Sequence, residues 1–260
     1  MPLSRQILVT ISVLITTIIL FDVTSIDLWV QDHLFDFGSQ SWLISDNDRI
    51  LDLIFYTGIK RVFFSAFILL GLILVICRKA IWMKRYRKTL LVVLLSMLAV
   101  PLAVGSLKSV THMPCPKHLE HYGGKFPHVT LFTAYPASFH ASRMPQCYPA
   151  GHASGAFSLF SLLFLFGGLW SRRIVLLAVM TIGWSVGIYK MMIGDHFLSH
   201  TLISMILAWL IILLIVRVIG RSDLVDNAKP VSKAYRYDKR FTASMETPVI
   251  TYPSSSGSSQ

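Results

Sequence analysis

Six long apolar segments are the feature that most restricts how this chain of 260 residues can fold. A helix that spans the hydrocarbon core of a bilayer needs about 20 consecutive, mostly apolar residues. Segments close to this length lie at residues 7–23, 62–77, 89–107, 152–170, 174–193 and 198–218. Only 14% of the residues are charged, against about 25% in an average soluble domain. The sequence therefore predicts an all-α, polytopic membrane bundle of about six transmembrane helices over residues 1–220.

A basic cluster between the second and third apolar segments sets the expected orientation, because Lys and Arg are enriched in cytoplasmic loops. Its members are Arg78, Lys79, Lys84, Arg85, Arg87 and Lys88. An even number of spans then places both termini in the cytoplasm and residues 25–61 and 108–151 outside. Residues 221–260 are polar and end in a Ser-rich run, so we expect a disordered cytoplasmic tail.

The net charge of +11 is mainly a consequence of this topology, with some affinity for anionic lipid. It does not indicate nucleic-acid binding, because no basic domain interleaved with aromatic residues stands apart from the membrane segments. The external loop 108–151 is rich in Pro and Gly and should be irregular, with short helices at most.

All nine histidines fall on the external side of this topology, and three of them lie where a loop meets an apolar segment. Ionisable groups at membrane depth are costly, so they are functional hypotheses by default. Three groups of residues meet on that side. They are Lys108 with Pro114-Cys115-Pro116, then Pro149-Ala150-Gly151-His152, then Tyr189-Lys190 with His196-Phe197-Leu198-Ser199-His200.

In order and spacing these groups resemble the type 2 phosphatidic acid phosphatase superfamily, whose motifs are KxxxxxxRP, PSGH and SRxxxxxHxxxD. Here the second motif reads PAGH and the third keeps its histidine in frame. Three departures stand out: Cys115 replaces the first Arg, Tyr189 and Lys190 replace Ser-Arg, and His200 replaces the Asp. The resemblance runs from Lys108 to His200 and implies the integral-membrane branch, which acts on lipid phosphates.

The resemblance also implies catalytic roles. His196 would attack phosphorus to form a phosphohistidine, while His152 would protonate the leaving oxygen and then activate water. Lys108 and Lys190 would supply positive charge, although as point charges without the fork of Arg. The amide of Gly151 would bind phosphate oxygens at a helix N-terminus.

His200 stands where the family has the carboxylate that orients the nucleophilic imidazole. Four residues after His196 on a helix, it faces the same side and could accept one hydrogen bond. Asp195 remains an alternative orienting group. No metal or cofactor is expected, because a zinc-protease pair needs Glu directly after the first His, where Phe197 stands.

Cys115 and Cys147 share the external loop, and the outer compartment of a bacterium is oxidising. We therefore expect a disulfide that closes a loop of about 33 residues and contributes roughly 3.5 to 4 kcal/mol on the chain-entropy model. Two free thiols are the alternative.

The expected activity is hydrolysis of a lipid phosphate or pyrophosphate at the periplasmic face of a bacterial inner membrane. The substrate is a phosphorylated membrane lipid, and the altered motifs favour a specialised envelope lipid such as lipid A. Alternatives are an undecaprenyl pyrophosphate phosphatase, a lipid phosphotransferase, and a metal- or haem-binding membrane protein. The sequence indicates no protein partner.

Overall fold

The computed structural model describes residues 1–46, 48–141 and 143–220, all within a compact unit that spans Met1–Lys229. The expected disordered tail, residues 221–260, lies outside the described residues. Almost all regular structure is helical, which confirms the predicted fold class. The helices are α1 (Leu3–Val23), α2 (Ile26–Asp32), α3 (Arg49–Asp52), α4 (Ile59–Ile76), α5 (Ile81–Thr111), α6 (Gly151–Ser158), α7 (Leu169–Met192) and α8 (Leu198–Ile219).

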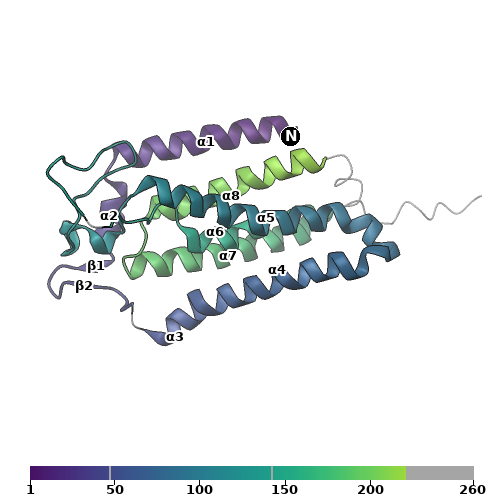
Figure 1. Cartoon of the computed structure of the whole chain (residues 1–260), viewed down its shortest axis with the longest axis horizontal. Helices are drawn as coiled ribbons and strands as arrows, with labels where there is room; N and C mark the ends of the chain where they lie inside the picture. Colours follow the sequence, from purple (N-terminus) through teal and green to yellow (C-terminus); the bar gives the residue numbers. More distant parts are fainter. Residues whose placement is uncertain (47, 142, 221–260) are drawn as a thin grey trace, which may run out of the picture. The chain divides into compact units, whose positions relative to one another are not determined.

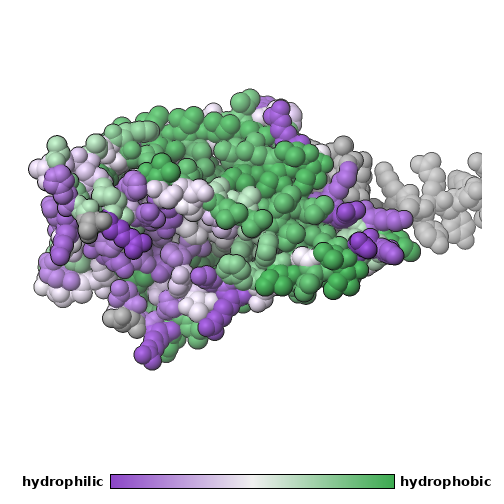
Figure 2. Space-filling view, in the orientation of Figure 1, coloured by the Kyte–Doolittle hydropathy of each residue, from purple (hydrophilic) through white to green (hydrophobic). Residues whose placement is uncertain are grey.

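The long helices run side by side, and the loops 33–48 and 112–150 gather at one end of the bundle (Figure 1). A two-stranded antiparallel hairpin, β1 (Phe35–Asp36) and β2 (Ser41–Trp42), lies at that end with α2. Figure 2 shows an apolar surface over the helices, with polar side chains towards both ends. This distribution is the one expected of a helical bundle that sits in a bilayer.

Five helical segments of the described chain are long and apolar enough to cross a membrane. They are Leu3–Val23, Arg49–Lys79, Ile81–His118, Leu169–Met192 and Leu198–Ile219. The number six is reached only if the shorter apolar segment Gly151–Phe164 is included.

That segment consists of eight α-helical residues followed by six 3-10 residues. Its length is about 24 Å, less than the ~30 Å of a hydrocarbon core. The hydroxyl groups of Ser154, Ser158 and Ser161 each donate to the carbonyl three residues earlier, which is the 3-10 spacing. The expected full-length fourth span is therefore wrong in length, because these serines offer the backbone other hydrogen bonds.

The helix of the second span begins inside the segment 25–61, which was expected to be a loop. Helical structure starts at Arg49, where the Asp48 carboxylate accepts the amides of Ile50 and Leu51 at 3.0 and 3.1 Å. Such N-capping stabilises a helix by about 1 kcal/mol. The π-helical turn Leu53–Gly58 then continues into α4, so residues 49–61 belong to the helix and not to a loop.

Helix α6 lies among α5, α7 and α8, and the core there contains Val92, Ala153, Phe157 and Ile212. Gly187 on α7 lies against Thr201 on α8, where an added methyl group would overlap the threonine side chain. The glycine thus lets α7 and α8 approach closely beside His200. This packing brings the start of α6 and the start of α8 to the same end of the bundle.

Candidate active site

His152, His196 and His200 form a row of imidazoles at the loop-bearing end of the bundle. Nδ1 of His152 lies 3.3 Å from Nε2 of His196, and Nδ1 of His196 lies 3.4 Å from Nδ1 of His200. His196 and His200 are buried, with 3% and 0% of their surface exposed. The structure therefore brings the three sequence-predicted histidines together.

A tight turn after α7 places His196. Gly194 has φ +74, a left-handed conformation that glycine adopts without strain, and the Trp42 ring occupies the space of its missing side chain. The carbonyl of Lys190 accepts the amides of Asp195 and His196 at 2.8 and 3.2 Å. These contacts fold the chain back, so His196 faces the start of α6.

The PAGH turn is held from three sides. The amide of Ala150 donates to the His200 carbonyl at 3.1 Å, and the Thr111 hydroxyl donates to the Tyr148 carbonyl at 2.6 Å. The predicted Cys115–Cys147 disulfide is present, with Cα atoms 5.2 Å apart. Together these contacts tie the turn before His152 to α5 and to α8.

The two predicted phosphate-binding lysines lie on either side of His152. A methyl group added to Gly151 would lie 3.7 Å from Nζ of Lys108, so this ammonium sits at the start of α6. Lys190 is buried, and its Nζ lies 2.9 Å from Asp195 Oδ2. Positive charge and the free amides of a helix N-terminus therefore meet next to His152.

Among the described residues the Asp195 carboxylate pairs with two lysines and with no imidazole, which favours His200 over Asp195 as the group that orients His196. This carboxylate joins Lys190 to Lys117, whose Nζ lies 2.8 Å from Oδ1. Burial by itself raises the pKa of Asp195, but the hydrogen bond from Lys117 and the charge of Lys190 hold this pKa below its usual value. Asp195 is thus an ionised group that fixes the position of Lys190.

Burial lowers the pKa of His196 well below its ordinary value, and the neighbouring imidazoles and the charges of Lys108 and Lys190 lower it further. His196 is consequently neutral at pH 7, with a lone pair available on one ring nitrogen. A neutral imidazole is the form that can act as a nucleophile.

Tyr56 and Lys117 were not predicted as site residues. The Tyr56 ring lies 4.8 Å from the His152 ring, and Lys190 Nζ lies 4.6 Å from the Tyr56 centroid. Tyr56 precedes the apolar stretch that marked the second span, and Lys117 belongs to no spacing motif. The only local signal for Tyr56 was its position, six residues before the apolar run 62–77.

One possible metal-ligand group occurs among the described residues: Cys115, His118 and Cys147, with ligand atoms within 4.8 Å of one another. Both of its sulfur atoms are joined in the disulfide, so this group offers no thiolate to a metal.

A cavity of about 230 Å³ adjoins His152. Its lining is mostly apolar and comes from the π-helical turn and α4, from α5, from α6 and from α7. The lining residues are Phe55, Tyr56, Ile59, Lys60, Phe63, Phe64, Pro101, Gly151, His152, Gly155, Ala156 and Val186.

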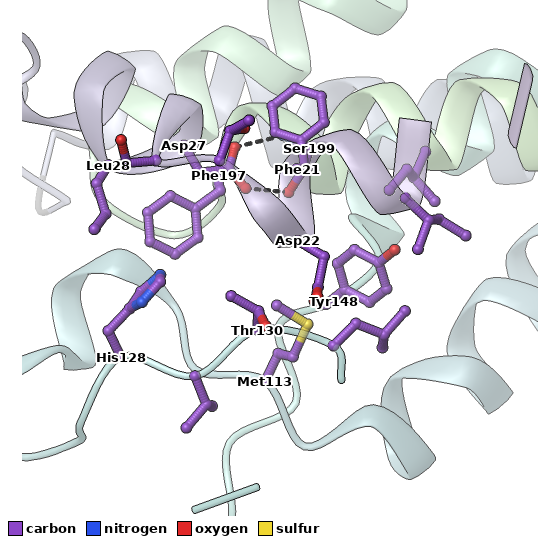
Figure 3. A pocket seen from close by; sticks show the side chains of 16 residues that line it. Phe21, Asp22, Asp27, Leu28, Met113, His128, Thr130, Tyr148, Phe197 and Ser199 are labelled. Atoms are coloured by element: carbon purple, nitrogen blue, oxygen red, sulfur yellow. Dashed lines mark hydrogen bonds between the residues drawn. The ribbon is translucent and has the colours of Figure 1, made fainter. Parts of the chain in front are cut away.

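A second, smaller cavity of about 30 Å³ lies behind the first turn of α8 (Figure 3). There Asp27 of α2 accepts the amide of Ser199 at 2.9 Å and also the Ser199 hydroxyl. Burial raises the pKa of Asp27 to about 6, although both hydrogen bonds from Ser199 lower it. Asp27 therefore caps the helix that carries His200 from a distant part of the chain.

The fold and the site define a multi-pass membrane protein with a largely buried group of histidines and lysines whose charges and hydrogen-bond donors suit a phosphate. The chain belongs to the PAP2 superfamily, whose sequence profile matches residues 89–223, more than half of the chain. This confirms the predicted family. Neither the curated proteins nor the solved structures contain a match to the chain. Because members of the superfamily are phosphatases, the protein is a phosphate-ester hydrolase that acts on a phosphorylated substrate.

Proposed function

We propose that the protein removes a phosphate from a membrane lipid phosphate or pyrophosphate in two steps, through a phosphohistidine at His196. The observation that carries this proposal is the approach of His196 Nε2 to His152 Nδ1, 3.3 Å apart, beside Lys108 and Lys190. A phosphoryl group that enters between the two rings replaces this contact. It then meets a nucleophile on one side and a proton donor on the other.

In the first step, His196 Nε2 attacks phosphorus, and the bond to the lipid oxygen breaks. His152, which the negative charge of the bound phosphate keeps protonated, gives its proton to that oxygen as it leaves. Lys108, the Gly151 amide and Lys190 neutralise the charge on the non-bridging oxygens. In the second step, His152 takes a proton from water, the water oxygen attacks phosphorus, and inorganic phosphate leaves His196.

His200 orients the nucleophile in this proposal. If Nε2 of His196 carries the reacting lone pair, its Nδ1 carries the hydrogen and donates it to Nδ1 of His200, 3.4 Å away. The assignment of this proton follows from the required role of Nε2. A neutral imidazole stabilises the resulting cationic phosphohistidine less than the family's carboxylate does.

The cavity beside His152 supports a lipid substrate over a soluble phosphate ester. Aromatic and aliphatic side chains line it, and they include Phe63, Phe64 and Pro101. Such a surface gains free energy by taking up hydrocarbon, at roughly 25 cal/mol per Å² buried. We assign it to the hydrocarbon chain of the substrate next to the reacting phosphate.

Among lipids, the altered first and third motifs favour a specialised envelope lipid such as lipid A phosphate. The active site then faces the periplasm of a bacterial inner membrane, with residues 25–48 and 112–150 outside and residues 78–88 inside. Cysteines introduced at 85 and 125 distinguish the two faces. A membrane-impermeant maleimide should label position 125 in intact cells and spare position 85.

The central experiment is phosphate release by purified protein from lipid A phosphate, undecaprenyl pyrophosphate and phosphatidate. His196→Ala should abolish release, and His33→Ala, a change at an exposed histidine, should not. Appearance of the phosphate on a second lipid instead of in water would support the phosphotransferase alternative. Full activity of His196→Ala would overturn the proposed mechanism.

A further inference from the structure

A third lysine, Lys60, lies beside the two that serve the reacting phosphate. It follows Tyr56 by one helical turn, and its Nζ lies 5.8 Å from the centroid of the Tyr56 ring. Lys190 Nζ lies 4.6 Å from the same centroid, and the ring itself contacts His152. The Tyr56 ring thus lies next to both lysines and to His152.

Lys60 and Lys190 differ in whether a carboxylate pairs with them. Lys190 is paired with Asp195, whereas no carboxylate of the described residues lies within ion-pair distance of Lys60. Lys60 nevertheless lines the same cavity as His152. A cation on a membrane-spanning segment is costly without an anion, unless it merely extends to the lipid headgroups.

The neighbours of Lys60 on its helical segment show where it lies relative to His152. The Tyr56 ring contacts the His152 ring, and a methyl group added at Gly155, one turn further along α6, would lie 3.9 Å from the Phe63 ring. Lys60 lies between Tyr56 and Phe63 on the same helical segment and lines the same cavity. We place the leaving group of the substrate in this cavity, beside Lys60.

We propose that Lys60 and Tyr56 form a second anion subsite, which binds the phosphate that stays on the lipid when a lipid diphosphate is hydrolysed. The inference rests on the proposed function and names a lipid diphosphate as the substrate class of the same site.

The chemistry accounts for a cation at this place. The bond between the terminal phosphorus and the bridging oxygen breaks, its electron pair stays on that oxygen, and His152 supplies the proton. The departing lipid monophosphate is an anion, and Lys60 neutralises it. With a lipid monophosphate the leaving group is a neutral alcohol, so Lys60 faces no charge.

The test compares a lipid diphosphate with the monophosphate of the same hydrocarbon chain, using the purified full-length protein. Lys60→Gln should lower kcat/KM for the diphosphate by about 10- to 100-fold, the range for a lost hydrogen bond to a charged group. It should change kcat/KM for the monophosphate by less than about 5-fold. Lys60→Arg should keep most of the diphosphate activity.

Arg61→Gln is the matched control, because Arg61 is exposed like Lys60 and carries the same charge but does not line the cavity. It should leave both activities unchanged, and an equal melting temperature for Lys60→Gln and wild type excludes a folding defect. Equal losses on the two lipids, or no loss on the diphosphate, would overturn the subsite.

Inorganic pyrophosphate gives a readout that needs no turnover. It should bind wild type more tightly than orthophosphate does, and Lys60→Gln should remove that preference. An unchanged preference in Lys60→Gln would overturn the subsite. Failure of the proposed function looks different: wild type would release phosphate from neither lipid, or His196→Ala would stay active.

Discussion

Nδ1 of His200 faces Nδ1 of His196 at 3.4 Å, in a place where neither ring has more than 3% of its surface exposed. One ring must donate and the other must accept, so the two imidazoles are coupled. His200 occupies the position where the family pattern has a carboxylate. This contact is the most direct point at which the mechanism can be tested.

Replacing His200 should change both the rate and its pH dependence. We expect His200→Ala to lower kcat by at least about 10-fold, because the nucleophile loses its orienting partner. His200→Asp should retain more activity than His200→Ala, since a carboxylate stabilises the cationic phosphohistidine. It should also raise the pKa of His196 from its lowered value, so the acidic limb of the kcat/KM profile moves to higher pH. A His200→Asp protein less active than His200→Ala would contradict the orienting role.

His152 and His196 should respond differently to the leaving group. His196→Ala should abolish turnover of every substrate, because the variant lacks the proposed nucleophile that forms the phosphoenzyme. His152→Ala should lose about 100- to 10,000-fold on a lipid phosphate and less on an activated aryl phosphate, whose leaving group needs no proton. The measurement is the rate of each variant on the lipid phosphate and on the aryl phosphate, relative to wild type. Equal losses on both would argue against His152 as the acid.

Vanadate should inhibit, since it can take the five-coordinate geometry of the phosphoryl transition state. Chelators should leave activity unchanged, because Lys108 and Lys190 supply the positive charge in this mechanism. Loss of activity with a chelator and its recovery with zinc would replace the mechanism by a metal-dependent one.

Reducing the Cys115–Cys147 disulfide should destabilise the protein. The bond joins residues 32 apart, and on the chain-entropy model it contributes about 3.5 to 4 kcal/mol. The double variant Cys115→Ser with Cys147→Ser should melt at a lower temperature than wild type, and reductant should lower the wild-type melting temperature. Cys77→Ser is the control, because Cys77 is a free cysteine. Ready alkylation of Cys115 and Cys147 in folded, unreduced protein would show that the bond is absent.

Asp27 accepts two hydrogen bonds from Ser199 (Figure 3). Its carboxyl group should make the stability of the protein depend on pH. Burial raises its pKa from 3.8 to about 6 in the folded protein, so between these values the folded state holds a proton that the unfolded state has released. Stability therefore falls as the pH rises from about 4 to about 6, by about 3 kcal/mol, and is constant above that range.

Asp27→Asn should remove this fall, because the amide does not titrate and can still accept the Ser199 amide. Melting temperatures of wild type and Asp27→Asn across pH 4 to 7 are the measurement. The difference between the two proteins should grow towards neutral pH, with the variant the more stable. A difference that does not vary with pH would show that Asp27 keeps its ordinary pKa.

Local sequence was enough for the family, the fold class, the disulfide and the convergence of His152, His196 and His200. A spanning helix needs an uninterrupted apolar run, and the motif residues have set spacings within single turns and helix ends. Each apolar run and each motif can be recognised in a single stretch of the sequence, and the order of the runs places the motifs at the same end of the bundle.

Only the tertiary structure decided which groups surround those histidines. Asp27 contacts Ser199 across 172 residues, and Tyr56 contacts His152 from a segment expected to be a loop. Asp195, next in sequence to the nucleophile, turned out to hold Lys190 and Lys117. Such contacts leave no local pattern, because they depend on how α2, α4 and α8 pack and not on the residues adjacent in the chain. The length of the fourth span was missed for a different reason. Composition shows how apolar a segment is but not where its helix ends, and the serine hydroxyls there bond to carbonyls within the same segment.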